Sequence, residues 1–523
     1  MANYSGLRGA HRVGARLVVA AITLLSLSLV LDGCSTPSAP ASAPKSAAPH
    51  GASPKRSGGT TVATLPAAQT VAAHIAWAPC PNRSGYLCGT LKVPLDYQYP
   101  SRGSVDLSVI ERPVANSKGV VIFNPGGPGE SGVLIMPILA ALVPATVRDQ
   151  FTLVSFDERG TGSSDPLLCG PSLDAATSAV AGTAAAAATF SGTEHSCSSR
   201  YPALFPTVNT TTSARDMNEL RIALGVDRIN YYGLSYGTVL GSVYRQLFPS
   251  HVRSMVLDGA VDLNLSLASE ATEEAPSIQT VLEHDLNSCT EMASCPLGAD
   301  PVAFYRDLQQ RLSRAPLPAP GKGDTTPVTE GDLYTATLLY LSVPGVSGGF
   351  FPALAAAAAG NGAQLRAVAL GLETDLNGQS LVGPLWTITC NDEAEHPDAS
   401  ATAALARSLE ARFPLGGAEA VSNNLIACPG WTEMGGSVAR LSPISPNKAP
   451  TSLVIGNTYD PNTPYDFAVQ LASAIGGRLV TYVGYGHTWL LNGSTNVCMQ
   501  NVVTAYLVNG VVPPKGVQCA ASS

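Results

Sequence analysis

Near the middle of the chain the sequence reads Asn230-Tyr231-Tyr232-Gly233-Leu234-Ser235-Tyr236-Gly237-Thr238-Val239-Leu240-Gly241. A β-prone run ends at Gly233, a helical pattern begins just after Ser235, and G-x-S-x-G lies between them. This pattern places a serine on a sharp, strained strand-to-helix turn, where larger side chains two residues away would collide with neighbouring backbone. The turn lifts Oγ above the sheet, and the start of the helix directs N–H groups at charge that develops during attack. Ser235 is therefore the predicted nucleophile.

A second match to the same pattern surrounds Ser347, between Gly345 and Gly349. Pro344 comes immediately before it and removes a backbone donor where the central strand of a nucleophile turn should end. The alanine-rich run that follows favours a helix without a preceding strand. The context of the two matches therefore favours Ser235.

Composition limits the class of protein. The 523 residues allow one large domain with an insertion or two domains, and a hydrophobic content of 45% is ample for a core. A charged content of 13% is low for a disordered chain. The net charge of −8 and the lack of a dense Lys/Arg run argue against nucleic-acid binding. We expect no cofactor, and the oligomeric state stays open.

The N-terminus has the pattern of an export signal over residues 1–33. Three arginines precede an apolar run from Leu17 to Val30, and small residues follow. The run of about 14 residues is short for a transmembrane helix, which is the alternative. Leu31-Asp32-Gly33-Cys34 resembles a bacterial lipobox, so we expect Cys34 to carry a lipid that provides the only membrane association. Residues 34–73 are rich in small and polar residues and predict a flexible tether.

Eleven cysteines fit an exported protein, because an oxidising compartment allows disulfides. Setting Cys34 aside leaves an even number. No C-x-x-C occurs and the histidines are scattered, so disulfides are favoured over a metal site. Sequence alone does not fix connectivity, but neighbouring cysteines suggest five pairs: Cys80–Cys88, Cys169–Cys197, Cys289–Cys295, Cys390–Cys428 and Cys498–Cys519.

Strands and turns surround the predicted nucleophile turn along the chain. Residues 105–114 predict an edge strand, and residues 119–123 a buried strand that ends in the loop N-P-G-G-P-G at 124–129. Such a loop supplies half of an oxyanion hole, since adjacent glycines let backbone approach a substrate carbonyl. The predicted hole combines the N–H groups of Gly127 and Tyr236. Residues 157–162, D-E-R-G-T-G, are interpreted as a structural loop with Arg159 as a buried charge.

The alternation of strands and helices stops after the strand at 252–257 and resumes near the C-terminus. We therefore expect a hydrolase-type core at 74–262, an inserted, mainly helical lid at 263–385, and the second part of the core at 386–523. The predicted fold is a mostly parallel α/β sheet with helices on both faces.

Two acidic residues and one histidine lie at or just after the C-terminal ends of predicted strands. Asp460 follows the strand at 451–456 and His487 follows the strand at 478–483. The order Ser235, Asp460, His487 is that of α/β-hydrolases rather than of chymotrypsin or subtilisin. Asp258 also ends a strand and remains the alternative acid.

These motifs resemble those of the exported tripeptidyl aminopeptidases of actinobacteria, a group of α/β-hydrolases related to prolyl aminopeptidases. The resemblance extends from about residue 75 to the C-terminus. It is carried by N-P-G-G-P-G, D-E-R-G-T-G, G-L-S-Y-G-T at 233–238, I-T-C-N-D at 388–392, D-P-N-T-P at 460–464 and G-H-T at 486–488. It implies an α/β-hydrolase fold and a serine peptidase. Pro125 stands where prolyl aminopeptidases often carry histidine, so their preference for proline does not carry over.

Three functions are compared. An aminopeptidase must hold the substrate ammonium with carboxylates under the lid, and the candidates are Glu273, Glu274, Asp392 and Glu393. A carboxylesterase or lipase would need only an apolar acyl pocket. A binding protein on an inactive scaffold is disfavoured by the intact set of Ser, Asp and His. We expect a peptide substrate, with an ester as the alternative.

Overall fold

The computed structural model describes residues 74–169, 184–292, 294–320, 326–343, 349–373, 381–394, 396, 398–425, 428–432 and 448–521. The expected export signal, Cys34, the tether and Ser347 lie outside these residues.

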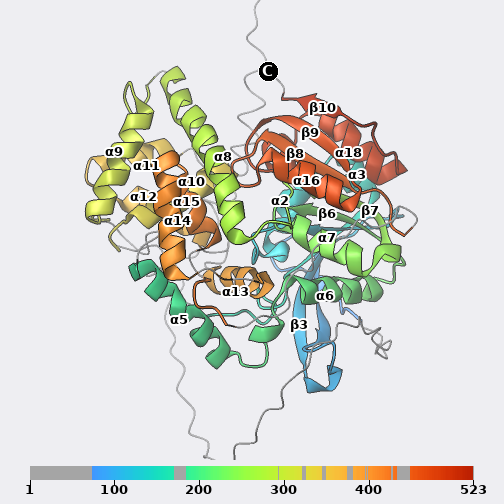
Figure 1. The fold of residues 1–523 in the computed structure, drawn as a ribbon. Helices are drawn as coiled ribbons and strands as arrows, with labels where there is room; N and C mark the ends of the chain where they lie inside the picture. Colours follow the sequence, from blue (N-terminus) through green and yellow to red (C-terminus); the bar gives the residue numbers. More distant parts are fainter. Residues whose placement is uncertain are drawn as a thin grey trace, which may run out of the picture.

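A twisted sheet forms the centre of the fold (Figure 1). In the described residues its strand order is β1-β2-β3-β5-β4-β6-β7-β8-β9-β10. Antiparallel pairing joins β1 to β2, β2 to β3 and β3 to β5, and every later pair is parallel. The sheet is therefore mostly parallel, as predicted. The strands are β1 (Ala78–Pro79), β2 (Leu87–Pro94), β3 (Ser104–Arg112), β4 (Val120–Asn124), β5 (Thr152–Phe156), β6 (Ile229–Leu234), β7 (Val252–Asp258), β8 (Leu453–Tyr459), β9 (Arg478–Tyr485) and β10 (Val517–Ala520).

The prediction of an edge strand at 105–114 was wrong. β3 lies inside the sheet, because β2 pairs with it from Leu87–Glu111 to Pro94–Ser104 and β5 pairs on its other side. β2 was missed because its sequence, LCGTLKVP, alternates only weakly and ends in proline.

Helices cover both faces of the sheet, so β4 and β6 are buried along their whole length. One apolar cluster packs α2 (Gly132–Leu142), α3 (Ala145–Gln150) and α18 (Val497–Asn509) against one face. A second cluster packs α6 (Thr210–Ala223), α7 (Gly237–Leu247) and α16 (Tyr465–Ile475) against the other. This arrangement places the ends of the parallel strands at one edge, where the predicted site residues lie.

A helical unit is inserted between β7 and β8 and forms its own apolar cluster beside the sheet (Figure 1). Its helices are α8 (Leu267–Ser288), α9 (Pro301–Arg314), α10 (Glu330–Ser342), α11 (Phe350–Ala358), α12 (Ala363–Glu373), α14 (Ala399–Arg412) and α15 (Gly417–Asn424). The unit therefore extends past the boundary expected at 385. A Cβ at Gly416 would lie 2.6 Å from the Ala275 carbonyl oxygen, so glycine allows the close approach of α15 to α8 that this packing needs.

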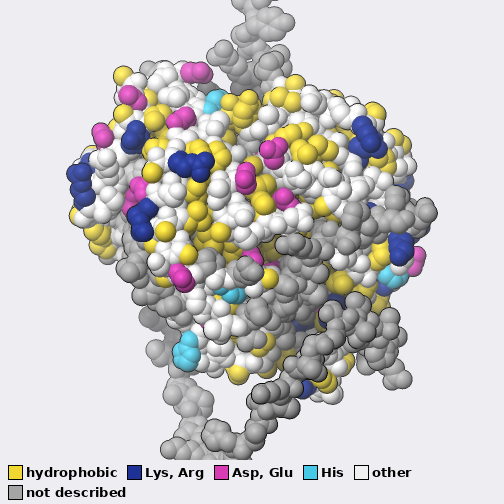
Figure 2. Space-filling view, in the orientation of Figure 1, with side chains coloured by type: hydrophobic (Ala, Val, Ile, Leu, Met, Phe, Trp, Pro, Cys, Tyr) yellow, Lys and Arg dark blue, Asp and Glu magenta, His cyan; other side chains and the backbone are white. Residues whose placement is uncertain are grey.

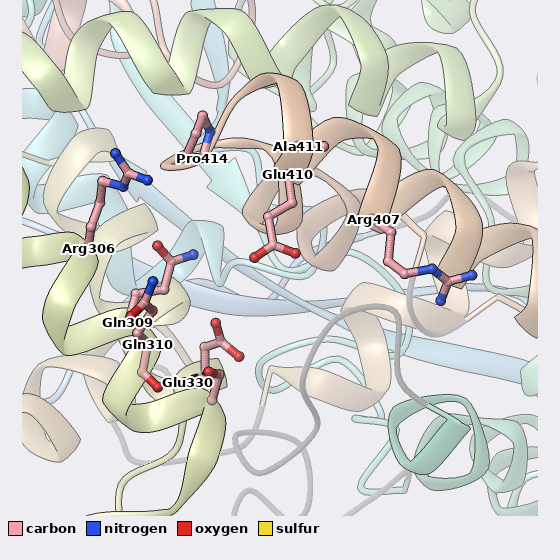
Figure 3. Close-up of a pocket in the computed structure, with 9 residues that line it drawn as sticks. Arg306, Gln309, Gln310, Glu330, Arg407, Glu410, Ala411 and Pro414 are labelled. Carbon is pink, nitrogen blue, oxygen red and sulfur yellow. Dashed lines mark hydrogen bonds between the residues drawn. The ribbon is translucent and has the colours of Figure 1, made fainter.

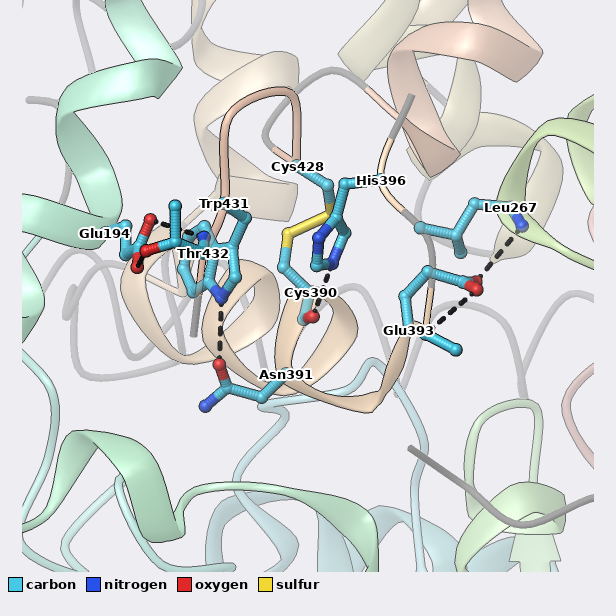
Figure 4. Close-up of a disulfide and its surroundings, with 10 residues drawn as sticks. Glu194, Leu267, Cys390, Asn391, Glu393, His396, Cys428, Trp431 and Thr432 are labelled. Atoms are coloured by element: carbon cyan, nitrogen blue, oxygen red, sulfur yellow. Dashed lines mark hydrogen bonds between the residues drawn. A yellow bond between two sulfur atoms is a disulfide. The ribbon is translucent and has the colours of Figure 1, made fainter. Parts of the chain in front are cut away.

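Helix α13 (Val382–Asp392) interrupts the helical unit and packs instead with the core cluster, through Trp386 and Ile388. The Cys390–Cys428 disulfide ties its end to the chain that follows α15 (Figure 4). The indole N–H of Trp431 donates to Asn391 Oδ1 at 2.9 Å beside this disulfide (Figure 4). The chain thus crosses from the helical unit to the core and back before it enters β8.

All five predicted cysteine pairs are disulfides in the structure. Five disulfides are consistent with an exported protein. Within the described ranges, no helix is both long and apolar enough to cross a bilayer. On the face shown in Figure 2, Lys and Arg side chains are dispersed among acidic and apolar ones.

Candidate active site

The turn around Ser235 has the backbone geometry expected of a nucleophile turn. Ser235 adopts φ +54° between β6 and α7, and its N–H donates to the Asp258 carbonyl at 2.9 Å. A Cβ at Gly233 would lie 2.3 Å from the Gly237 carbonyl oxygen, and one at Gly237 would lie 2.8 Å from Asn124 Oδ1. Both glycines of the motif are therefore required by sterics, as the sequence predicted.

The loop after β4 lies against this turn. Gly126 adopts φ +105°, and a Cβ there would lie 2.7 Å from the Leu234 carbonyl oxygen and 3.0 Å from Ser235 Cβ. Gly127 adopts φ +104°, and the Gly126 N–H donates to Asn124 Oδ1 at 3.0 Å. The loop can approach the serine only because two glycines stand here.

The two predicted oxyanion donors lie on the loop after β4 and on the nucleophile turn. In the part of the chain that the structure describes, neither the Gly127 N–H nor the Tyr236 N–H donates a hydrogen bond to another protein group. Gly127 is exposed, whereas Tyr236 is buried. Buried backbone donors are almost always paired, so the Tyr236 N–H beside the serine, which has no partner among the described residues, is available for a ligand oxygen.

Asp460 and His487 lie together past the ends of β8 and β9. His487 Nδ1 lies 2.9 Å from Asp460 Oδ1 and 3.1 Å from Oδ2, and both side chains are buried. The Asp460 carboxylate also accepts from the N–H groups of Asn462 (3.0 Å), Thr463 (2.9 Å) and Thr488 (3.3 Å). These bonds fix the carboxylate and leave the Nε2 side of the imidazole turned away from it.

The alternative acid, Asp258, has a different set of partners. Its Oδ1 accepts from the Trp489 N–H at 2.8 Å, and its Oδ2 accepts from the Leu490 N–H and the Tyr232 hydroxyl, both at 2.9 Å. Burial raises the pKa of Asp258 to about 6. Asp258 thus caps the start of α17 (Trp489–Asn492) rather than contacting the imidazole.

Ser235 and His487 lie in the same region of the site, but no hydrogen bond joins their side chains in the described residues. The Ser235 N–H donates to the carbonyl oxygen of Asp258. The residue that follows Asp258 is Gly259, and a Cβ there would lie 3.2 Å from His487 Cε1. No hydrogen bond between Ser235 Oγ and His487 Nε2 occurs within the described residues. Such bonds are often long without substrate and shorten in the bound complex.

The four carboxylates predicted to bind an amine divide into two groups. Glu273 faces solvent on α8, and Asp392 accepts from the N–H (3.0 Å) and hydroxyl (2.5 Å) of Thr210, so neither is available. Glu274 is buried and lies close enough to Asp460 for that charge to contribute to its raised pKa, after burial and the charge of Glu270. Glu393 Oε2 accepts from the Leu267 N–H at the start of α8 (Figure 4).

Two further acids in this region were missed by sequence reasoning. Glu270 lies one turn before Glu274 on α8, and burial, followed by the charges of Glu393 and Asp262, raises its pKa to about 7. Glu419 of α15 is fully buried, and neither carboxylate oxygen has a hydrogen-bond partner among the described residues. Burial and then the charge of Glu274 raise its pKa well above the ordinary value. The spacing of four on a helix puts Glu270 and Glu274 on one face, and this signal could have identified Glu270.

A polar cavity lies apart from these residues, inside the helical unit. It has a volume of about 420 Å³ and is lined from α9, α10 and α14 by side chains that include Arg306, Gln309, Glu330, Arg407 and Glu410 (Figure 3). None of the candidate site residues lines it. In the described residues, no group of three or more His, Cys, Asp or Glu side chains is placed to hold a metal ion.

The fold and the residues around Ser235 define an α/β-hydrolase. The α/β-hydrolase fold family model matches residues 119–494, and the chain belongs to this family. The serine protease Hip1 of Mycobacterium tuberculosis H37Rv is 31% identical over 483 residues, which cover 85% of this chain and 91% of that protein. The carboxylesterase B of the same strain is 31% identical over 527 residues, covering 95% of this chain and 97% of that protein. The tripeptidyl aminopeptidase of Streptomyces lividans is 34% identical over 220 residues, covering 38% of this chain and 41% of that protein.

These relatives make the chain a hydrolase of an actinobacterial group that includes serine peptidases, as the sequence motifs predicted. The names of the relatives cover both a peptidase and an esterase. The choice between these activities therefore depends on the residues around the site.

Proposed function

We propose that the protein is an exported serine aminopeptidase that releases short peptides from free N-termini through an acyl-enzyme on Ser235. In this mechanism His487 takes the Ser235 proton and Asp460 holds the imidazole in the correct tautomer. The N–H groups of Gly127 and Tyr236 stabilise the oxyanion of the tetrahedral intermediate. His487 then returns the proton to the leaving amine.

One observation carries the preference for an aminopeptidase. Glu270, Glu274 and Glu419 form a cluster of carboxyls for which no Lys or Arg of the described residues forms an ion pair. Without a cation these carboxyls are favoured in the protonated form, as their raised pKa values indicate, and a ligand that brings positive charge would favour the ionised form and be bound by it. The ammonium of a peptide N-terminus supplies that charge. An ester substrate would leave the cluster uncompensated.

Matched substitutions on α8 test this preference. We expect Glu274→Gln to lower kcat/KM for a free tripeptide nitroanilide by about 10- to 100-fold, since a charge-assisted contact is worth about 1.5–3 kcal/mol. The N-acetylated peptide and a short nitrophenyl ester should be cleaved equally by Glu274→Gln and the wild type. Glu273→Gln is the control, because Glu273 is its exposed neighbour on the same helix.

The same measurements distinguish an aminopeptidase from a carboxylesterase. If the wild type cleaves free and acetylated peptides at equal rates, the aminopeptidase proposal fails. Turnover of the ester without peptide cleavage would favour a carboxylesterase, the activity named for one relative. Loss of fluorophosphonate labelling in Ser235→Ala is required by either activity, whereas Ser347→Ala should keep the label.

The proposal extends to the location of the enzyme. Residues 1–33 would direct export, Cys34 would carry the lipid, and residues 34–73 would hold the enzyme away from the membrane. The partners would then be substrate and lipid bilayer, and the net charge of −8 argues against nucleic acid. Cys34→Ala should abolish incorporation of an alkyne-labelled fatty acid in cells, and continued labelling would overturn the assignment.

A further inference from the structure

A buried chain of hydrogen bonds runs behind the predicted oxyanion hole. Tyr236 Oη lies 3.2 Å from Glu158 Oε2 and 2.6 Å from Thr210 Oγ1, which lies 2.5 Å from Asp392 Oδ2. The four side chains come from four separate parts of the chain: the loop after β5, the turn at the start of α7, the start of α6 and the end of α13. Asn124 adds a fifth member, since its Nδ2 donates to Glu158 Oε1 at 3.0 Å.

This chain contacts both halves of the predicted hole. Tyr236 carries one of the free N–H donors on its backbone, and its ring is held by Glu158 and Thr210. Asn124 accepts from the Gly126 N–H, next to Gly127, which carries the other donor. Glu158 therefore connects the two N–H donors, through Tyr236 to one and through Asn124 to the other. A shift of about 1 Å in either donor would be expensive for catalysis.

The number of protons in the chain is set by its contacts. Three oxygen–oxygen contacts join Glu158 to Tyr236, Tyr236 to Thr210 and Thr210 to Asp392. Two hydroxyl groups supply only two hydrogens, and each contact needs one. The third hydrogen must come from a carboxyl, so one of Glu158 and Asp392 is protonated while the other is ionised.

The charges around Glu158 and Asp392 agree with one proton shared between the two carboxyls. Glu158 is 2% exposed, and no Lys or Arg of the described residues forms an ion pair with Glu158 or Asp392. Arg159, the next residue, is committed to Asp216 at 2.6 Å. Burial raises the pKa of Glu158 to about 6 and that of Asp392 to about 7, and the charge of Glu158 contributes to the second shift. The other charges that face the pair are those of Asp216, towards Glu158, and Glu393, towards Asp392.

We propose that Glu158 and Asp392 share one proton through Tyr236 and Thr210, and that this chain is a positioning device for the oxyanion hole. Neither carboxyl touches the substrate. They act through Tyr236 and Asn124, which hold the two N–H donors at a fixed separation. The proposal rests on the hydrolase site around Ser235 but is independent of its preference for peptides.

Amide substitutions test the proton count. In Asp392→Asn the amide oxygen can accept from the Thr210 N–H, and the NH₂ group can donate to Thr210 Oγ1 in place of the shared proton. In Glu158→Gln the oxygen accepts from Asn124, the NH₂ donates to Tyr236, and the hydroxyls reverse toward Asp392. Each single variant should therefore keep kcat within about threefold, because every contact retains one hydrogen. The double variant has one hydrogen too many and should lose about 10- to 100-fold in kcat.

The measurements use a nitrophenyl ester, which has no amine of its own to titrate. The loss in the double variant should fall on kcat rather than KM, and the affinity for phenylboronic acid, which forms a tetrahedral adduct with a serine, should fall in parallel. The kcat of the wild type should also decline on the alkaline side as the shared proton leaves, and Asp392→Asn should abolish this decline. A role in folding alone would not change the pH profile of kcat in this way.

Two hydroxyl deletions cover the case in which the double variant does not fold. Tyr236→Phe breaks the chain and should lower kcat about tenfold. Tyr334→Phe is the matched control, since Tyr334 is equally buried and donates to Glu330 at 2.8 Å beside the cavity of Figure 3. Losses in the double variant that equal the product of the single losses, or equal kcat in Tyr236→Phe and Tyr334→Phe, would overturn the proposal. A wild type that neither cleaves the ester nor takes the fluorophosphonate label would instead refute the hydrolase site itself.

Discussion

Replacing Asp460 by asparagine should invert the tautomer of His487. The Asp460 Oδ1 atom accepts from two backbone N–H groups, those of Asn462 and Thr463, so the oxygen of the asparagine must take this position. Its NH₂ group then occupies the Oδ2 position, 3.1 Å from His487 Nδ1 and 3.3 Å from the Thr488 N–H. The oxygen at the Oδ1 position also lies 2.9 Å from Nδ1, but two backbone N–H groups already occupy its lone pairs. His487 Nδ1 and the Thr488 N–H would therefore both face the NH₂ donor. The imidazole can relieve one conflict by moving its proton from Nδ1 to Nε2.

An imidazole protonated at Nε2 cannot accept the Ser235 proton. We therefore expect kcat to fall by about 10⁴, which corresponds to about 5.4 kcal/mol of transition-state stabilisation. The unpaired Thr488 N–H should also lower the free energy of unfolding, by about 1–3 kcal/mol. The assay is steady-state hydrolysis of a nitrophenyl ester and a tripeptide nitroanilide, with thermal unfolding measured in parallel.

Asp258→Asn is the matched control, because Asp258 is as deeply buried and ends the neighbouring strand. Its carboxylate caps α17 and makes no hydrogen bond to the imidazole. This variant should lose stability by about 1–3 kcal/mol but keep kcat within about tenfold. A fall of about a thousandfold or more in Asp258→Asn, together with a mild effect of Asp460→Asn, would refute the assignment.

Three further predictions concern the loop, the pH dependence of stability and the disulfide of α13. Gly126→Ala should lower kcat by about a hundredfold or more, because its Cβ would lie 2.7 Å from the Leu234 carbonyl oxygen. Gly225→Ala, at a φ of +68° with no atom within 4 Å, should affect only stability. The free energy of unfolding should fall as the pH rises from about 4 to 7, because buried carboxyls with raised pKa values bind more protons in the folded chain than in the unfolded chain. Denaturant titration measures this change. An increase over the same pH range would contradict the raised pKa values of Glu158, Asp258, Glu270 and Asp392. Replacing Cys390 and Cys428 by alanine should cost about 4 kcal/mol for a loop of 38 residues, and an unchanged midpoint of thermal unfolding would show that the disulfide does not restrain the unfolded chain.

The parts of the site that depend on local backbone geometry were predictable from the sequence. The positions of Gly233 and Gly237 around Ser235 and of Gly126 and Gly127 after β4 are fixed by close approaches and positive φ angles within short segments. Short-range sterics leave few residues that fit such positions, so the motif identifies the conformation. The cysteine pairs followed for a related reason, since at most 38 residues separate the partners.

The choices among residues of the same type required the tertiary structure. Asp258 and Asp460 both end parallel strands, and only the packing of the loops after β8 and β9 shows that Asp460 faces His487. Glu273 and Glu274 are adjacent in sequence, but α8 packs one face against α15, so Glu274 is buried and Glu273 is exposed.

The same holds for the course of the chain through the helical unit. Helix α13 packs with the core, while α14 and α15 return to the helical unit. Likewise, Asp392 lies beside Thr210 across 182 residues of sequence. Local patterns report the conformation of a segment and the face it can bury. The partner of that face is decided by contacts between distant segments, and no pattern within one segment records them.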